Sequence, residues 1–90
     1  QLCFDCGIAN KLFSADDLDT ETHKWAHALA SGAPLSMAAA KRLLRQVGRM
    51  SFGEAITAEG LEQNPLTQSD DFKAGVKAFF DKEKPVFKGR

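Results

Sequence analysis

The chain has 90 residues, enough for one small domain or for a part of a larger one. Hydrophobic residues make up 43% and charged residues 27%, a composition typical of a soluble globular chain and not of a disordered one. Twelve basic residues balance twelve acidic ones, and no apolar run approaches the roughly 20 residues of a spanning helix, so neither a dedicated nucleic-acid binder nor a membrane protein is expected.

The N-terminal segment, residues 1–13, is expected to form an extended lead-in. Residues 7–13 mix apolar side chains with two polar ones, which is typical of a short strand. A single strand has no pairing partner within this sequence, so its backbone groups would need a partner outside the chain. The chain also begins without Met and inside an apolar segment, which we interpret as a cut or trimmed boundary.

The only two cysteines, Cys3 and Cys6, lie in this N-terminal segment. Two cysteines do not make a disulfide framework, which favours a reducing compartment. No basic-then-apolar leader opens the chain. We therefore expect a location in the cytoplasm or the mitochondrial matrix and not secretion.

Four amphipathic helices are predicted in residues 14–90. The first begins at Ser14, whose side-chain oxygen can accept a hydrogen bond from the amide of Asp17. The second begins at Pro34, a favoured first helical residue. The first helix has an apolar arc at helical spacing, which consists of Leu18, Thr22, Trp25, Ala26 and Leu29.

The second helix is predicted to have one apolar and one basic face. The apolar face consists of Met37, Ala40, Leu43, Leu44 and Val47. The basic face consists of Lys41, Arg42, Arg45 and Arg49. Such a stripe can bind phosphates, but the balanced net charge and the lack of interleaved aromatic residues favour a solvated helix face.

The third and fourth helices are marked by their N-terminal caps. Ser51 and Glu54 have the spacing of a capping box, and Pro65 ends the third helix within a turn. Ser69 is the expected cap of the fourth helix, which Pro85 is expected to stop. The sequence therefore predicts an all-α fold of about four amphipathic helices, preceded by a short extended segment.

One arrangement of cysteines and histidines is close to that of a zinc finger. Cys3 and Cys6 are followed by His23 and His27, and 16 residues separate the two pairs. Zinc fingers of this kind have a gap of about 12–15 residues between the pairs. The longer gap, and the position of both histidines opposite the apolar arc, favour surface histidines and free thiols over a metal site.

No other pattern has the form of an active site. The sequence has no Gly-rich phosphate loop and no Gly-x-Ser-x-Gly elbow. The acidic pairs Asp16–Asp17 and Asp70–Asp71 lie at predicted helix starts, where interaction with the helix dipole explains them. We expect the chain alone to be non-catalytic and to hold no cofactor.

Six segments nevertheless follow one another in the order and spacing of one known family, across nearly the whole chain. Residues 7–13 (Gly-Ile-Ala-Asn-Lys-Leu-Phe) resemble a strand written Gly-Leu-Val-Asn-Arg-Val-Val, and residues 14–18 resemble the helix start Pro-x-Asp-Glu-Leu. Residues 33–44 are similar to Pro-x-Ala…Thr-Lys-Arg-Leu-Leu, and residues 52–63 to Leu-x-x-Ala-Leu-x-x-Glu-x-x-x-Gln. The chain thereby resembles the crotonase (enoyl-CoA hydratase/isomerase) superfamily.

The C-terminal third of the chain carries the fullest part of this resemblance. Residues 69–82 and 85–90 are similar to the closing family motif Ser-Glu-Asp-Phe-x-Glu-Gly-Val-x-Ala-Phe-x-x-Lys-Arg-x-Pro-x-Phe-x-Gly-Arg. Two positions depart from it. Ala74 replaces a customary Glu, and Glu83 replaces a basic residue, which weakens the attraction for phosphates.

The resemblance implies a C-terminal helical segment of a protein that acts on acyl-CoA thioesters, as in fatty-acid metabolism. Residues 1–13 would be a remnant of the last core strand and residues 14–90 the helical subdomain. The family's oxyanion-hole amides and catalytic acids would lie upstream, so no catalytic residue is expected here. Family members are oligomers, and a homo-oligomer is implied.

By the same resemblance, Phe79 and Lys82 would contact CoA. They are three residues apart on one predicted helix, so a ring and a cation can flank one ligand. The alternative interpretation is that Phe79 packs in a core and Lys82 is solvated. In that case the chain is a helical protein-interaction module without affinity for CoA.

Overall fold

The computed structural model describes all 90 residues and contains α-helices and no strand, which confirms the all-α prediction. No helix in it is both long and apolar enough to cross a membrane. The chain divides into two compact units, residues 1–30 and 31–90, which we describe separately. The five helices are α1 (Leu2–Asp5), α2 (Leu18–Ala30), α3 (Pro34–Val47), α4 (Phe52–Thr67) and α5 (Asp70–Asp81).

The first unit begins with a helical turn and not with an extended segment. Residues Leu2–Asp5 form one helical turn, and the amides of Ile8 and Ala9 donate back to the carbonyl of Cys3 at 2.8 and 2.9 Å. Gly7 has a φ of 73°, which allows this reversal at no steric cost. Residues 2–9 are therefore folded on themselves, because local hydrogen bonds satisfy their backbone groups. No strand forms at the predicted residues 7–13, of which residues 11–13 have no regular secondary structure.

The predicted hydrogen bond of Ser14 forms, although α2 itself begins only at Leu18, after a turn at residues 15–17. The amide of Asp17 donates to the Ser14 side-chain oxygen at 3.1 Å, and the Ser14 hydroxyl donates to the Asp17 carboxylate at 2.7 Å. The ammonium of Lys11 lies over the ring of Trp25 on this helix, 4.8 Å from the ring centre. This cation–π contact joins α2 to the irregular segment that precedes it.

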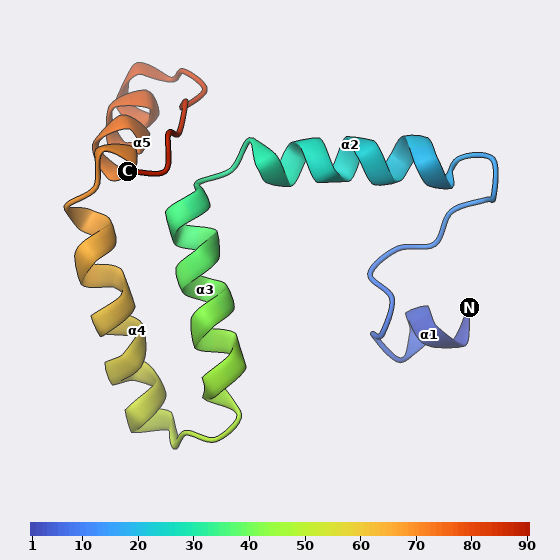
Figure 1. The fold of residues 1–90 in the computed structure, drawn as a ribbon, viewed down its shortest axis with the longest axis horizontal. Helices are drawn as coiled ribbons and strands as arrows, with labels where there is room; N and C mark the ends of the chain where they lie inside the picture. The colour runs from blue at the N-terminus through green and yellow to red at the C-terminus, as the bar shows by residue number, and fades with distance from the viewer. The chain divides into compact units, whose positions relative to one another are not determined.

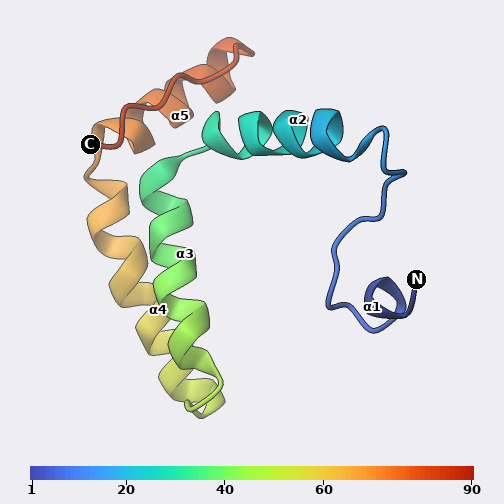
Figure 2. The ribbon, with the colours of Figure 1, turned by 45° about the vertical axis from the view of Figure 1, so that its right-hand side comes forward.

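In the second unit, α3 and α4 lie side by side as an antiparallel hairpin (Figures 1 and 2). Pro34 occupies the first turn of α3, and Ser51 and Glu54 form the predicted capping box at the start of α4. Ala39 is 3% exposed, because a small side chain lets the two helices approach closely. Pro65 lies in the last turn of α4, which ends at Thr67, as the sequence predicted.

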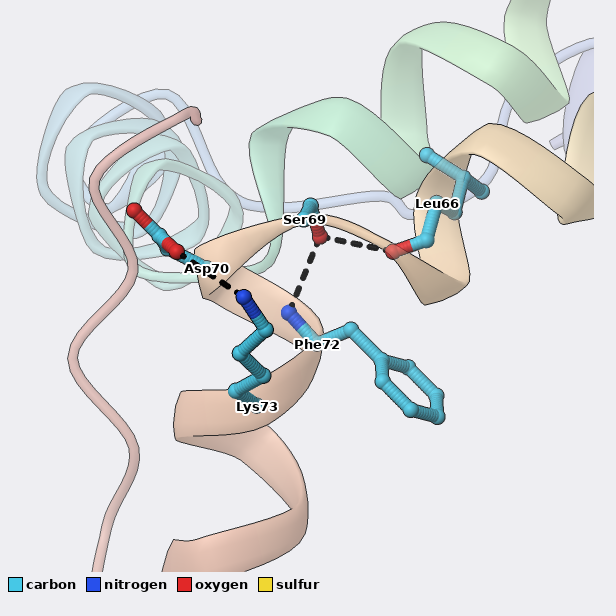
Figure 3. Close-up of polar contacts among 5 residues, drawn as sticks. All are labelled: Leu66, Ser69, Asp70, Phe72 and Lys73. Carbon is cyan, nitrogen blue, oxygen red and sulfur yellow. Dashed lines mark hydrogen bonds and ion pairs between the residues drawn. The ribbon is translucent and has the colours of Figure 1, made fainter.

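A short connection leads from α4 into α5. The amide of Phe72 donates to the Ser69 side-chain oxygen at 3.0 Å, and the Ser69 hydroxyl donates to the carbonyl of Leu66 at 2.7 Å (Figure 3). Ser69 thereby caps α5, as predicted, and also ties it to the end of α4. The close-up also shows Asp70 facing Lys73 one turn further along.

The end of α5 differs from the prediction. The helix ends at Asp81, and the chain reverses at Lys82, whose φ of 56° and ψ of 35° are left-handed. The predicted stop, Pro85, lies three residues beyond this reversal. The amide of Glu83 donates to the carbonyl of Ala78 at 2.9 Å, which completes a C-terminal capping motif of the kind that usually has Gly at the left-handed position.

Candidate functional site

The C-terminal residues 85–90, here called the strap, return along α5 toward its start (Figures 1 and 2). The Asp71 carboxylate accepts hydrogen bonds from the backbone amides of Lys88 at 2.6 Å and Gly89 at 2.9 Å. The amide of Asp71 itself donates to the carbonyl of Arg90 at 2.9 Å. Three hydrogen bonds therefore fix the end of the strap to the first turn of α5.

Asp71 is only 4% exposed, and it is the only buried charged residue of the chain. Because an unpaired buried carboxylate is strongly disfavoured, its two backbone donors are needed for its burial. The sequence analysis explained the position of Asp71 at a helix start by its interaction with the helix dipole alone. That explanation was incomplete. Its main partners lie 17 and 18 residues further along the chain.

Two glycines let the strap approach its neighbours. A β-carbon at Gly75 would lie 3.5 Å from Cε1 of Phe87, so the Phe87 ring packs close to the α5 backbone. Gly89 has a φ of 75°, and a β-carbon there would lie 3.5 Å from the ring of Pro34. The strap therefore contacts both α5 and the start of α3.

Beside the strap lies an open cavity of about 430 Å³. The first turn of α3, the end of α4, α5 and the strap contribute to its walls. Its apolar lining includes Leu35, Leu66, Phe72, Val76, Phe79 and Phe87. A cavity of this size and lining is typical of a surface that accepts apolar groups.

Phe79, one of the two predicted CoA-contacting residues, lies at this cavity and is 79% exposed. Its ring meets that of Phe80 edge to face, with the ring centres 5.7 Å apart. Lys82, three residues further along, is also exposed. It is the left-handed residue that directly follows the last residue of α5. The structure therefore presents both side chains at the same end of one helix.

Lys82 is in a conformation that is costly for a residue with a β-carbon. Left-handed backbone dihedrals cost about 1–2 kcal/mol for such a residue and almost nothing for Gly. The cost is partly offset by the capping hydrogen bond from Glu83 to Ala78. Neither Lys82 nor Glu83 takes part in an ion pair.

The basic stripe of α3 is partly neutralised within the unit. Arg42 donates to both carboxylate oxygens of Glu62 on α4, with Nε–Oε1 and Nη2–Oε2 distances of 3.2 and 2.6 Å. These hydrogen bonds lower the pKa of Glu62 and raise that of Arg42. The other basic residues of the stripe, Lys41, Arg45 and Arg49, are exposed and form no ion pair.

The four candidate zinc ligands are all exposed in the first unit. Cys3 and Cys6 are free thiols at α1, whereas His23 and His27 lie on α2. His23 Nδ1 lies 2.9 Å from the carbonyl of Asp19, within hydrogen-bonding distance. The structure brings together no three side chains of His, Cys, Asp or Glu that could hold a metal ion.

Comparisons with known proteins agree on one family. The model of a family described as enoyl-CoA hydratase/isomerase matches residues 3–90. Over 86 residues the chain is 33% identical to the methylmalonyl-CoA decarboxylase of Escherichia coli K12, covering 92% of this chain and 33% of that protein. Over 88 residues it is 34% identical to the carnitinyl-CoA dehydratase of Proteus mirabilis, covering 93% of this chain and 34% of that protein.

Solved structures show the same likeness. The chain matches an enoyl-CoA hydratase from Geobacillus kaustophilus with a TM-score of 0.91 and 31% identity, covering 100% of this chain and 34% of that one. It matches a probable enoyl-CoA hydratase/isomerase from Mycobacterium abscessus with a TM-score of 0.87 and 32% identity, covering 100% and 36%. The chain thus spans about a third of the length of these relatives.

Proposed function

Because this chain belongs to the enoyl-CoA hydratase/isomerase family, we propose that it is the C-terminal helical segment of a protein that acts on acyl-CoA thioesters. Its relatives named above differ in reaction, since one is a decarboxylase and another a dehydratase. Both names refer to an acyl group joined to CoA. The proposal therefore concerns binding of the CoA portion and leaves the acyl chain and the reaction open.

The observation that carries this proposal is the pairing of an exposed ring and a free cation at the end of α5. Phe79 is 79% exposed, and an aromatic face is a suitable surface for the adenine ring of CoA. The Lys82 ammonium, which has no carboxylate partner, can approach the CoA phosphates. Glu83, the residue after Lys82, opposes phosphate binding and predicts a weak contact.

In this proposal the chemical step belongs to the rest of the parent protein. The first turn of α5 contains two carboxylates, but Asp71 is buried by its bonds to the strap and Asp70 pairs with Lys73. Neither is arranged as a general acid or base. The contribution of this chain is then to bind CoA and to pack against other parts of the assembly.

Phe79 can be tested by substitution with a matched control. Equilibrium dialysis with labelled acetyl-CoA should show weaker binding for Phe79→Ala than for the unchanged chain. Phe52 is the control, because it is 83% exposed at the start of α4 and does not line the cavity. Equal loss of binding in Phe79→Ala and Phe52→Ala would contradict a specific contact.

A second function, subunit association, is favoured by the exposed apolar side chains of residues 31–90. Large side chains more than 70% exposed are Leu44, Phe52, Leu61, Phe79, Phe80 and Val86. Large exposed apolar patches mark surfaces that other protein covers, and of these side chains the rings of Phe79 and Phe80 are in contact. We expect a homo-oligomer, whose mass in sedimentation velocity rises with concentration, whereas a monomer at high concentration would contradict it.

The two functions can be separated. Phe80 is 76% exposed and lines the cavity, so Phe80→Ser should reduce self-association. An oligomer that shows no affinity for CoA would identify the chain as a helical interaction module. Binding of CoA by a monomer would support the CoA contact alone.

A further inference from the structure

The helix α5 and the strap form a closed loop that begins and ends at Asp71. From Asp71 the chain runs up α5, reverses at Lys82 and returns as the strap to the Asp71 carboxylate. The reversal and the carboxylate are therefore the two ends of one structural element.

The left-handed conformation of Lys82 needs a cause outside Lys82 itself. Lysine has no side-chain group that favours this region, and such residues persist only where the surrounding structure dictates them. Local hydrogen bonds accompany the reversal, since the Lys82 amide donates to the carbonyls of Ala78 and Phe79 and the Glu83 amide donates to the carbonyl of Ala78 at 2.9 Å, but they do not set the direction in which the chain continues. The strap, held by three hydrogen bonds at Asp71, requires the chain to turn back directly after α5.

We infer that Asp71 is a positioning residue whose carboxylate holds the strap and thereby fixes the left-handed backbone of Lys82. This holds the Lys82 ammonium in a defined place, three residues beyond Phe79. The consequence for ligand binding rests on the proposed CoA contact, whereas the mechanical coupling of Asp71 to Lys82 does not. Asp71 itself touches no ligand in this account.

The strap also shapes the cavity. Phe87 lines the cavity and packs on Gly75, and the ring of Pro34 lies against Gly89 near the end of the strap. Release of the strap would remove Phe87 from the cavity wall. The same carboxylate therefore controls both the cation at the end of α5 and one side of the apolar surface beside it.

The test compares Asp71→Asn with Asp70→Asn in the full chain. The asparagine side chain has one oxygen and one NH₂ group, so its NH₂ group faces one of the two strap amides. One hydrogen bond is thereby replaced by repulsion between two N–H donors. Asp70 is the matched control, because it is an exposed aspartate in the same turn of α5 and pairs only with Lys73. Both substitutions remove one negative charge near the helix start.

We expect Asp71→Asn to increase amide hydrogen exchange at Lys88 and Gly89 by at least about 10-fold, because hydrogen bonds to a charged acceptor are strong. The three-bond coupling constant between the amide and α protons of Lys82 reports its φ angle. It should at the same time move away from the value that corresponds to a φ of 56°. Asp70→Asn should change neither. Unchanged Lys82 coupling in Asp71→Asn, with the strap amides exchanging freely, would overturn the inference.

Binding of acetyl-CoA supplies an independent readout. Asp71→Asn should weaken binding as much as Lys82→Ala does, and should have no further effect when Lys82→Ala is already present. Additive losses, or full binding by Asp71→Asn, would contradict positioning through Lys82. If the unchanged chain does not bind acetyl-CoA, the proposed function fails, and the exchange and coupling data alone decide the inference.

Discussion

The ring of Phe87 packs on the backbone of Gly75, with its Cε1 3.5 Å from the point where a β-carbon would stand. That distance is an ordinary contact, so a methyl group fits and a larger side chain does not. Gly75→Ala should therefore stabilise the chain by about 0.5–1 kcal/mol through helix propensity. Gly75→Leu should instead displace Phe87 and lower the melting temperature in circular dichroism.

Gly60 on α4 is the control for this pair, because no atom lies within 4 Å of its β-carbon position. Gly60→Ala and Gly60→Leu should both stabilise the chain by propensity alone. A loss of stability in Gly75→Ala, or equal behaviour of the two leucine variants, would show that Phe87 does not pack on Gly75 in solution.

The caps of α4 and α5 are expected to differ in strength. Ser69→Ala should destabilise the chain by about 1–2 kcal/mol, because Ser69 caps α5 and also donates to Leu66 at the end of α4 (Figure 3). Ser51→Ala removes a cap that is exposed, and should cost less. Chemical denaturation of both variants measures this difference, and a larger effect at Ser51 would contradict it.

The ion pair between Arg42 and Glu62 gives a pH-dependent prediction. The hydrogen bonds from Arg42 lower the pKa of Glu62 below its ordinary value of 4.5. A lowered folded-state pKa means that the stabilisation is present above pH 4.5 and is lost as the pH falls through the lowered value. The effect should be small and sensitive to salt, because both side chains are partly exposed.

An NMR titration of the Glu62 carboxyl group checks this prediction. Arg42→Gln should raise the pKa of Glu62 toward its ordinary value, and Arg42→Lys should restore part of the shift without the two-point geometry. Glu54 is an internal control, because its pKa is lowered by hydrogen bonds from Ser51 and not by Arg42. An unchanged Glu62 titration in Arg42→Gln would show that the pair does not form.

Two positions with positive φ should respond in opposite directions to substitution. Lys82→Gly should stabilise the chain by about 1 kcal/mol, because it relieves the left-handed lysine. Gly89→Ala should destabilise it, because Gly89 has a φ of 75° and faces the ring of Pro34. Thermal unfolding distinguishes the two, and a destabilised Lys82→Gly would mean that the reversal at Lys82 is not strained.

Local signals made most of the helices predictable from the sequence. The caps at Ser51 and Ser69 each act within three residues, and the structure confirms both. Ser14 accepts the predicted hydrogen bond from Asp17, but α2 begins later, at Leu18. The same holds for Pro34 at the first turn of α3. The turn α1 was missed because a single helical turn has too few residues to show a periodic pattern.

The features that shape the candidate site depend on contacts between distant residues. Asp71 meets Lys88 and Gly89, which no local pattern indicates, so its role was attributed to the helix dipole. The end of α5 was predicted at Pro85, because the residue that reverses the chain is Lys82 and not the expected Gly. The roles of Phe79 and Lys82 remain predictions from the family resemblance.

The most direct test of the account is a calorimetric titration of the chain with acetyl-CoA, repeated with Lys82→Gly and Lys84→Ala. Lys84 is the control, because it is an exposed lysine two residues beyond Lys82. The account predicts saturable binding that is weakened in Lys82→Gly, although that variant is the more stable protein, and is unchanged in Lys84→Ala. No heat of binding at millimolar acetyl-CoA, or equal loss in both variants, would contradict a CoA contact at Lys82.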